Sequence, residues 1–204
     1  MPALPLSTTG FVLLKRPPAD AFQSFTAFSP EHGLLAVLQR LSKKPAASPP
    51  LDLFDEASLQ LESTNQGRTW FVREARLLTR HADLGRSYDA LRLASALAAL
   101  VARNPVPAES RAPVAELLRQ AFASLAAGAR PDIVWFKSLY RFARNEGHPV
   151  REQWFPTLPA ADRAAVATLL NQPLSAQTAR PAAVARLTAR LAEYLTGHTE
   201  ILVE

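Results

Sequence analysis

Cysteine is absent from the 204 residues of the chain, and glycine occurs only seven times. The lack of cysteine excludes disulfides, thiolate zinc sites and cysteine nucleophiles. The few glycines form neither a glycine-rich phosphate-binding loop nor a nucleophile elbow. The four histidines are His32, His81, His148 and His198. No two of them stand at a metal-ligand spacing such as i, i+4, so the sequence predicts no catalytic residue, no metal site and no cofactor.

Long apolar runs are absent as well. The longest apolar stretch, near residues 93–102, spans about ten residues and is interrupted by Ser95, which is too short to cross a bilayer. Residues 1–7 lack a charged region followed by a long apolar core, so we expect no signal peptide. We therefore expect a soluble, cytoplasmic protein that does not contact a membrane.

The excess of positive charge is modest and is spread along the chain. The formal net charge is +5 and the isoelectric point is about 10.1. Residues 1–81 contain 9 Lys or Arg and 7 Asp or Glu, and residues 82–204 contain 14 and 11. A basic surface must therefore be assembled by folding. Such a surface would fit a polyanionic partner without requiring one.

Five runs that are typical of β-strands precede residue 83. In chain order they are Gly10–Arg16, Ala21–Phe28, Leu34–Leu41, Ala57–Glu62 and Trp70–Leu78. Strands of this length and spacing favour a small closed barrel over an open sheet. Five strands within about 80 residues predict an OB-like barrel, a fold that commonly presents one face to oligonucleotides. Single-stranded nucleic acid is therefore the first partner to consider.

The pattern of apolar residues changes at Asp83. Before it they alternate or form short blocks, and after it they recur every three or four residues and alanine becomes frequent. Asp83 is expected to cap a helix that ends near Asn104. This helix has two apolar sets on nearly opposite faces, so we expect it to be buried between neighbours. The sets are Leu84, Tyr88 and Leu91, and Leu93, Leu97 and Leu100.

Four further helices are expected after this first one. Three of them cover residues 110–127, 132–145 and 160–171, and the last begins at Pro181. Gly147 is expected at the C′ position of the second, and Gly197 is expected to stop the last. The predicted fold class is therefore α+β with two domains: an OB-like barrel over residues 1–81 and an all-α domain over residues 82–204.

Positive residues gather at the ends of the expected strands and in the loop after the third strand. They are Lys15, Arg16, Arg40, Lys43, Lys44, Arg68, Arg73 and Arg76. Trp70 and Phe71 lie among the last three. In a small barrel these residues can converge into a cationic groove that tracks a phosphate backbone while rings stack on bases, which gives affinity without sequence readout. The alternative is that the charges are ordinary solvated side chains and that both rings belong to the core.

A second cationic stripe lies on the expected helix over residues 132–145. Lys137, Arg141 and Arg144 follow one another at i, i+4 and i+7, and Trp135, Leu139 and Phe142 flank them. The cations could form hydrogen bonds with carboxylates while the flanking residues contact apolar side chains. The stripe therefore predicts a binding site for the acidic, apolar tail of a protein partner. The alternative is a solvated helix face.

Taken in order, these features resemble the bacterial DNA repair protein family RecO. The segments that carry the resemblance are Thr9–Lys15, Phe25–Gly33, Arg40–Lys44, Arg73–Arg76, Phe136–Gly147 and Tyr194–His198. They correspond to the family's opening strand, its Phe-Thr-x-x-x-Gly turn, its basic segment, its last barrel strand, its Phe-x-x-x-x-Leu-x-x-x-Gly helix and its C-terminal helix. The order and spacing of the segments carry the resemblance, which covers most of the chain.

The resemblance implies a DNA repair and recombination mediator without enzymatic turnover. It implies binding of single- and double-stranded DNA by the barrel, strand annealing, partnership with RecR and help in loading RecA. It also implies contact with the C-terminal tail of single-strand-binding protein and a nucleoid-associated location. The chain departs from the family in lacking the four-cysteine zinc site that many members carry after the glycine equivalent to Gly147.

Two other functions stay open. A non-catalytic adaptor could keep the same fold and lose DNA binding. The modest net charge would favour it, as would the lack of the family's Gly-Ala in the basic segment, where this chain has Leu38–Ser42. An enzyme has the weakest case, because its chemistry would rest on His32 or His148 without partners.

Overall fold

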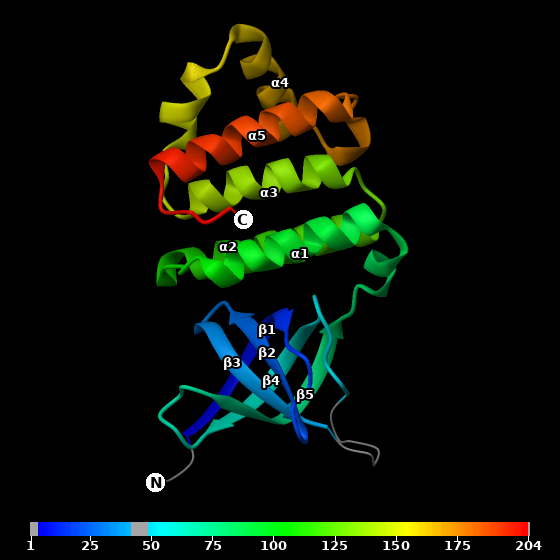
Figure 1. Ribbon diagram of the computed structural model, residues 1–204, viewed down its shortest axis with the longest axis vertical. Coiled ribbons are helices and arrows are strands. Elements are labelled where there is room, and N and C mark those ends of the chain that lie inside the picture. Colours follow the sequence, from blue (N-terminus) through cyan, green and yellow to red (C-terminus); the bar gives the residue numbers. More distant parts are fainter. Residues whose placement is uncertain (1–3, 42–48, 204) are drawn as a thin grey trace. The chain divides into compact units, whose positions relative to one another are not determined.

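The computed structural model describes residues 4–41 and 49–203 (Figure 1). Lys43 and Lys44 lie outside the described residues. The chain forms two compact units. One joins the residues up to His81 with Val101–Ala115, and the other joins Ala82–Leu100 with the residues from Glu116 onward. The predicted domain boundary after residue 81 stays a prediction.

The N-terminal strands form the predicted OB-like barrel. They are β1 (Leu4–Lys15), β2 (Phe22–Ser29), β3 (Gly33–Arg40), β4 (Glu56–Ser63) and β5 (Trp70–Thr79). The strands, labelled in Figure 1, close in the order β1-β2-β3-β5-β4. All neighbours are antiparallel except β3 and β5, which pair in parallel. Because β5 lies between β3 and β4, the connectivity is that of a Greek-key barrel.

Alternation along the strands explains the core of the barrel. In β3 every second residue from Gly33 to Gln39 is buried, and the residues between them are exposed or half-buried. Such a period of two sends one set of side chains inward. The barrel core is built from apolar residues of all five strands; its members include Val12, Phe25, Val37, Leu59, Leu61 and Trp70. β1 begins six residues before the predicted Gly10, because its first half pairs with β4 although it is rich in proline, serine and threonine.

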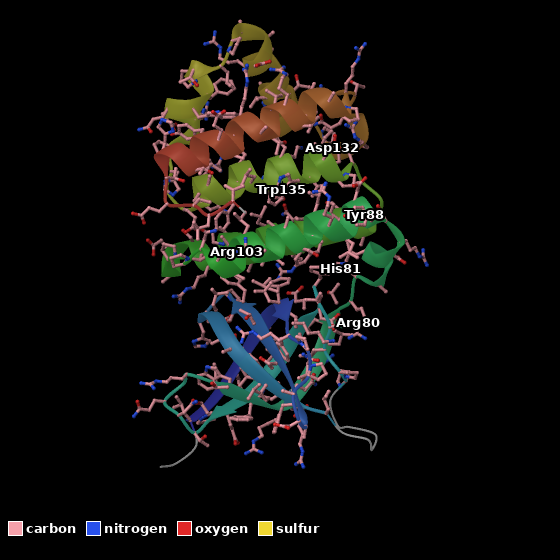
Figure 2. All side chains as sticks on the ribbon, in the orientation of Figure 1. Arg80, His81, Tyr88, Arg103, Asp132 and Trp135 are labelled. Carbon is pink, nitrogen blue, oxygen red and sulfur yellow. The ribbon has the colours of Figure 1, made fainter. Side chains whose placement is uncertain are left out.

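A buried carboxylate ties the end of β5 to the segment before β4. Asp55 is 0% exposed and accepts hydrogen bonds from Arg80 Nε at 2.9 Å and Nη2 at 2.6 Å. It also accepts one from the Asp52 backbone N–H at 2.8 Å. Arg80, labelled in Figure 2, donates a further hydrogen bond to the Pro50 carbonyl at 2.8 Å. A buried charge that is paired and hydrogen-bonded in this way holds two chain segments together.

Helices follow the barrel. The α-helices are α1 (Tyr88–Arg103), α2 (Ala108–Ala126), α3 (Pro131–Asn145), α4 (Ala160–Asn171) and α5 (Pro181–His198). Short turns of helix are η1 (Ala82–Arg86), η2 (Val150–Trp154), η3 (Phe155–Thr157) and η4 (Leu174–Ala176). α3 and α5 lie side by side in Figure 1 and contact each other. These helices confirm the predicted helical region.

Two predictions for α1 were wrong. The helix begins at Tyr88, because Ser87 caps it: its carbonyl accepts the N–H of Leu91 at 2.9 Å and its Oγ accepts that of Ala90 at 3.3 Å. Asp83 belongs to the separate turn η1. Tyr88 is 79% exposed and Leu91 39% exposed. The helix is therefore not buried on both sides.

The predicted role of glycine is confirmed at one helix end and wrong at another. Gly147 has φ +83°, and its N–H bonds to the Arg144 carbonyl while the next N–H bonds to the Ala143 carbonyl. This is the Schellman arrangement in which glycine is favoured. Gly197 does not stop α5, which continues to His198 and ends where Thr199 becomes extended.

Candidate nucleic-acid interface and arginine pocket

The register of three strands assembles one outer face of the barrel. Phe22 of β2 lies across from Arg40 of β3, and Ser24 lies across from Leu38. Leu38 in turn pairs with Phe71 of β5. We call these five residues the β2–β3–β5 face. The residues next to them in sequence, Gln23, Gln39 and Trp70, are buried.

Two rings meet on this face. The centroids of Phe22 and Phe71 are 5.8 Å apart, and their planes are inclined by 74°. Both side chains are half-buried, whereas Trp70 is only 7% exposed and belongs to the core. Of the two alternatives that the sequence left open, burial in the core holds for Trp70, whereas Phe71 is half-buried at the surface and its role as a stacking ring stays a prediction.

Phe22 was missed by the sequence analysis, although a signal was present. Phenylalanine occurs at positions 22, 25 and 28, a spacing of three within one strand. A strand alternates its side chains with a period of two, so Phe22 and Phe25 must point to opposite sides. The structure buries Phe25 in the barrel, which leaves Phe22 on the outside.

The predicted barrel cations differ in how they are paired. Lys15 Nζ lies 3.0 Å from Asp52 Oδ1, and Arg73 Nε lies 2.6 Å from Glu62 Oε2. The remaining candidates that the structure describes are exposed and form no ion pair with any described residue; they are Arg16, Arg40, Arg68 and Arg76. Two of the six described cations are thus partly neutralised by neighbouring carboxylates.

Only some of these cations lie at the β2–β3–β5 face. Arg40 is part of it, and the Arg16 backbone N–H bonds to the Ser24 carbonyl at 3.0 Å beside it. Arg68 and Arg73 flank the start of β5 on either side of Phe71. Arg76 pairs with Ser58 of β4, beyond the stretch where β5 meets β3, so it does not belong to this face.

The second candidate site is a pocket in the helical region. Arg141 and Arg144 from α3 and Arg151 from η2 line a cavity of about 430 Å³ together with Tyr140 and Phe155, and α4 closes it with Ala167, Leu170 and Asn171. We call this the arginine pocket. None of its three arginines forms an ion pair with a residue that the structure describes. Burial raises the pKa of Tyr140, and the positive charges of Arg144 and Arg151 oppose that rise.

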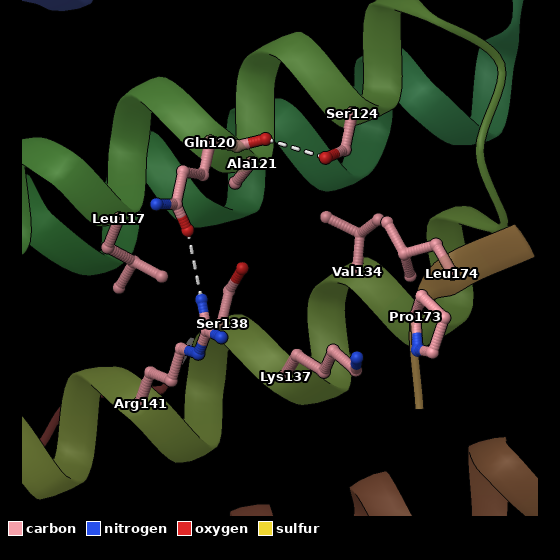
Figure 3. A pocket seen from close by; sticks show the side chains of 10 residues that line it. All are labelled: Leu117, Gln120, Ala121, Ser124, Val134, Lys137, Ser138, Arg141, Pro173 and Leu174. Carbon is pink, nitrogen blue, oxygen red and sulfur yellow. Dashed lines mark hydrogen bonds between the residues drawn. The ribbon is translucent and has the colours of Figure 1, made fainter. Parts of the chain in front are cut away.

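Lys137, the first residue of the predicted stripe, is held by the protein itself. Its Nζ donates a hydrogen bond to the Gln172 carbonyl at 2.7 Å. Burial and the neighbouring charge of Arg141 lower its pKa. Arg141 donates to Gln120 Oε1 at 3.0 Å across a smaller cavity of about 230 Å³, which Figure 3 shows between α2 and α3. Lys137 and Arg141 thus help to join helices as well as to line cavities.

The flanking residues of the stripe were predicted wrongly in part. Leu139 and Phe142 are 0% exposed, so they cannot touch a ligand. The rings that line the arginine pocket are Tyr140 and Phe155. Arg151 was also missed, because it follows the turn at Gly147 in a short π-helical segment where the sequence has no periodic signal.

The described residues contain neither a candidate metal site nor a candidate membrane-spanning helix. No group of three or more His, Asp or Glu side chains is placed to hold a metal ion within residues 4–41 and 49–203. None of the helices in those ranges has the length and apolar character needed to cross a membrane.

Comparison with known proteins did not identify a family. No protein-family model matches the chain, and no curated protein sequence matches it. The resemblance to the RecO family therefore stays a prediction.

Proposed function

We propose that this chain is a non-catalytic DNA repair and recombination mediator of the RecO type, which binds single- and double-stranded DNA and anneals strands. The observation that carries the proposal is the OB-like barrel with an exposed Arg40, which has no ion-pair partner among the described residues, on the same β2–β3–β5 face as two rings. OB-like barrels use this region for oligonucleotides. Arg16 beside this face and Arg68 before β5, which form no ion pair with a described residue, add positive charge.

Phosphate neutralisation would supply most of the affinity. Each guanidinium that contacts a phosphate releases condensed counterions, so binding weakens as salt is added. Two DNA strands repel each other through their phosphates, and a protein that neutralises part of this charge lets complementary bases meet. Annealing would follow from binding alone, without a catalytic residue.

The arginine pocket supports a protein partner. Three guanidinium groups without an acidic partner among the described residues suit a peptide rich in carboxylates, and Tyr140 and Phe155 suit an apolar side chain beside them. The RecO resemblance implies a partner of this kind, the acidic and apolar C-terminal tail of single-strand-binding protein. Partnership with RecR, help in loading RecA and a location at the nucleoid belong to the same proposal.

Fluorescence anisotropy of a labelled single-stranded oligonucleotide tests the proposal. We expect binding at low salt, with an affinity that falls steeply as salt rises; each phosphate contact contributes about 0.7 to the slope of log K against log salt for a single strand. A labelled duplex should bind with a similar salt dependence. The absence of binding to either DNA at low salt would contradict the proposal.

A second candidate function is a protein-interaction adaptor that does not bind DNA. The specific observation in its favour is that Lys15 and Arg73 of the barrel already pair with Asp52 and Glu62, whereas the arginine pocket holds three cations without such partners among the described residues. Binding of an acidic peptide together with no binding of DNA would favour this function.

A further inference from the structure

The Phe22–Phe71 pair is half-buried on the outer β2–β3–β5 face of the barrel, which also holds the cationic side chain of Arg40. The two rings come from β2 and β5, which lie on either side of β3. Their centroids are 5.8 Å apart at an angle of 74°, an edge-to-face contact. In such a contact the edge of one ring meets one face of the other, so the pair leaves further ring faces uncovered by its own packing.

A cationic side chain lies directly across from one of these rings. Phe22 and Arg40 are directly opposite in the antiparallel pair of β2 and β3, where Cβ atoms are about 5 Å apart. Both side chains point outward, because Gln23 and Gln39 next to them are buried. In such an arrangement the ring can stack on a base while the cationic side chain contacts the phosphate of the same nucleotide.

We propose that the Phe22–Phe71 pair stacks on an unpaired base while Arg40 contacts the adjoining phosphate, so that the β2–β3–β5 face prefers single-stranded over double-stranded DNA. This inference rests on the proposed DNA-binding function and adds the ligand class to it. In a duplex the base faces are already stacked within the helix, and only phosphates are available to the protein. Stacking tolerates any base, so the preference is for strandedness and not for sequence.

Three ligands of equal length separate stacking from charge: an oligothymidine, an oligonucleotide of the same phosphate backbone with abasic sites, and a duplex. One stacked base contributes about fivefold to a hundredfold in affinity. The wild-type protein should therefore bind oligothymidine at least about fivefold more tightly than the abasic strand. Equal affinity for these two strands overturns the inference while leaving salt-dependent DNA binding intact. Binding of none of the three overturns the proposed function as well.

A double variant tests the rings themselves. Phe22→Leu with Phe71→Leu keeps apolar side chains but removes both flat faces, and Phe71→Tyr is the matched control that keeps a ring. We expect the double variant to lose the oligothymidine preference and to bind the abasic strand and the duplex as the wild type does, whereas Phe71→Tyr keeps the preference. Equal weakening toward all three ligands in the double variant would show that the rings only support the barrel, and would overturn the inference.

Discussion

The barrel face and the arginine pocket both place guanidinium groups beside aromatic rings, but their shapes differ. On the β2–β3–β5 face, Arg40 and two phenylalanines lie on the outside of a sheet. In the helical region, three arginines from α3 and η2 converge on a cavity of about 430 Å³. An open face suits an extended polymer, whereas a concave pocket suits a short charged group. The same chemistry is thus arranged for two different kinds of ligand.

The largest effect is expected from removing the buried carboxylate of the barrel. Asp55→Ala would leave the Arg80 guanidinium and the Asp52 N–H without their acceptor. Breaking a buried ion pair costs about 3–5 kcal/mol. Arg80 is 40% exposed and can be rehydrated, so we expect the free energy of unfolding, measured in urea, to fall by about 2–3 kcal/mol.

Lys15→Met provides the control for this barrel variant. Its partner Asp52 is 64% exposed, and exposed ion pairs contribute at most about 1 kcal/mol. If Lys15→Met lowered the free energy of unfolding as much as Asp55→Ala does, burial of the Asp55 carboxylate would not explain the large effect of removing it.

The two candidate sites should be separable by charge reversal. Arg144→Glu with Arg151→Glu would remove two of the three cations of the arginine pocket. Hydrogen bonds to charged groups contribute about 1.5–3 kcal/mol each, so we expect at least a tenfold loss of affinity for a labelled acidic peptide with an apolar C-terminal residue. DNA affinity, measured by anisotropy in parallel, should stay within about twofold of the wild type.

Lys137→Met is the matched control within the same helix. Because its ammonium group is bonded to the Gln172 carbonyl, we expect peptide affinity to change by less than about threefold. A loss as large as that of the double variant would place Lys137 in the peptide site. A parallel loss of DNA affinity in the double variant would instead make the pocket a DNA surface.

A smaller, pH-dependent effect is expected in the helical region. Hydrogen bonds from Arg186, assisted by its charge and that of Arg190, lower the pKa of Asp162 despite its burial. The folded state therefore binds this proton less readily than the unfolded state. The stabilisation is present above about pH 4 and is lost as the pH falls through the lowered pKa.

Asp162→Asn tests this pH dependence. Urea unfolding at pH 6 and at pH 3 should show a smaller difference for the variant than for the wild type, because the variant lacks the proton that the wild type takes up. An unchanged difference would assign the acid sensitivity to other carboxylates.

The fold could be predicted because its signals are local and repeated. Alternating or short blocks of apolar residues predicted all five strands, and the predicted range of α4 agrees with the observed Ala160–Asn171. The start of α1 was wrong because both Asp83 and Ser87 are good capping residues, and only the observed hydrogen bonds to Ser87 decide between them.

The candidate sites were harder to predict, because they depend on contacts between distant segments. The spacing of Arg141 and Arg144 on one helix is visible in the sequence, but the addition of Arg151 depends on how the chain turns after Gly147. Likewise, Phe22 and Phe71 are 49 positions apart, and only the order of the strands brings their rings together.

Arg40→Glu and Arg76→Glu, compared by anisotropy with a labelled single-stranded oligonucleotide over a series of salt concentrations, test most directly whether the β2–β3–β5 face binds DNA. Both variants make the same change in charge on β-strands of the barrel, but only Arg40 lies on this face. We predict that Arg40→Glu weakens binding about tenfold and lowers the salt slope by about 0.7, while Arg76→Glu stays close to the wild type. Equal losses in the two variants, or wild-type binding that does not change with salt, would contradict the account.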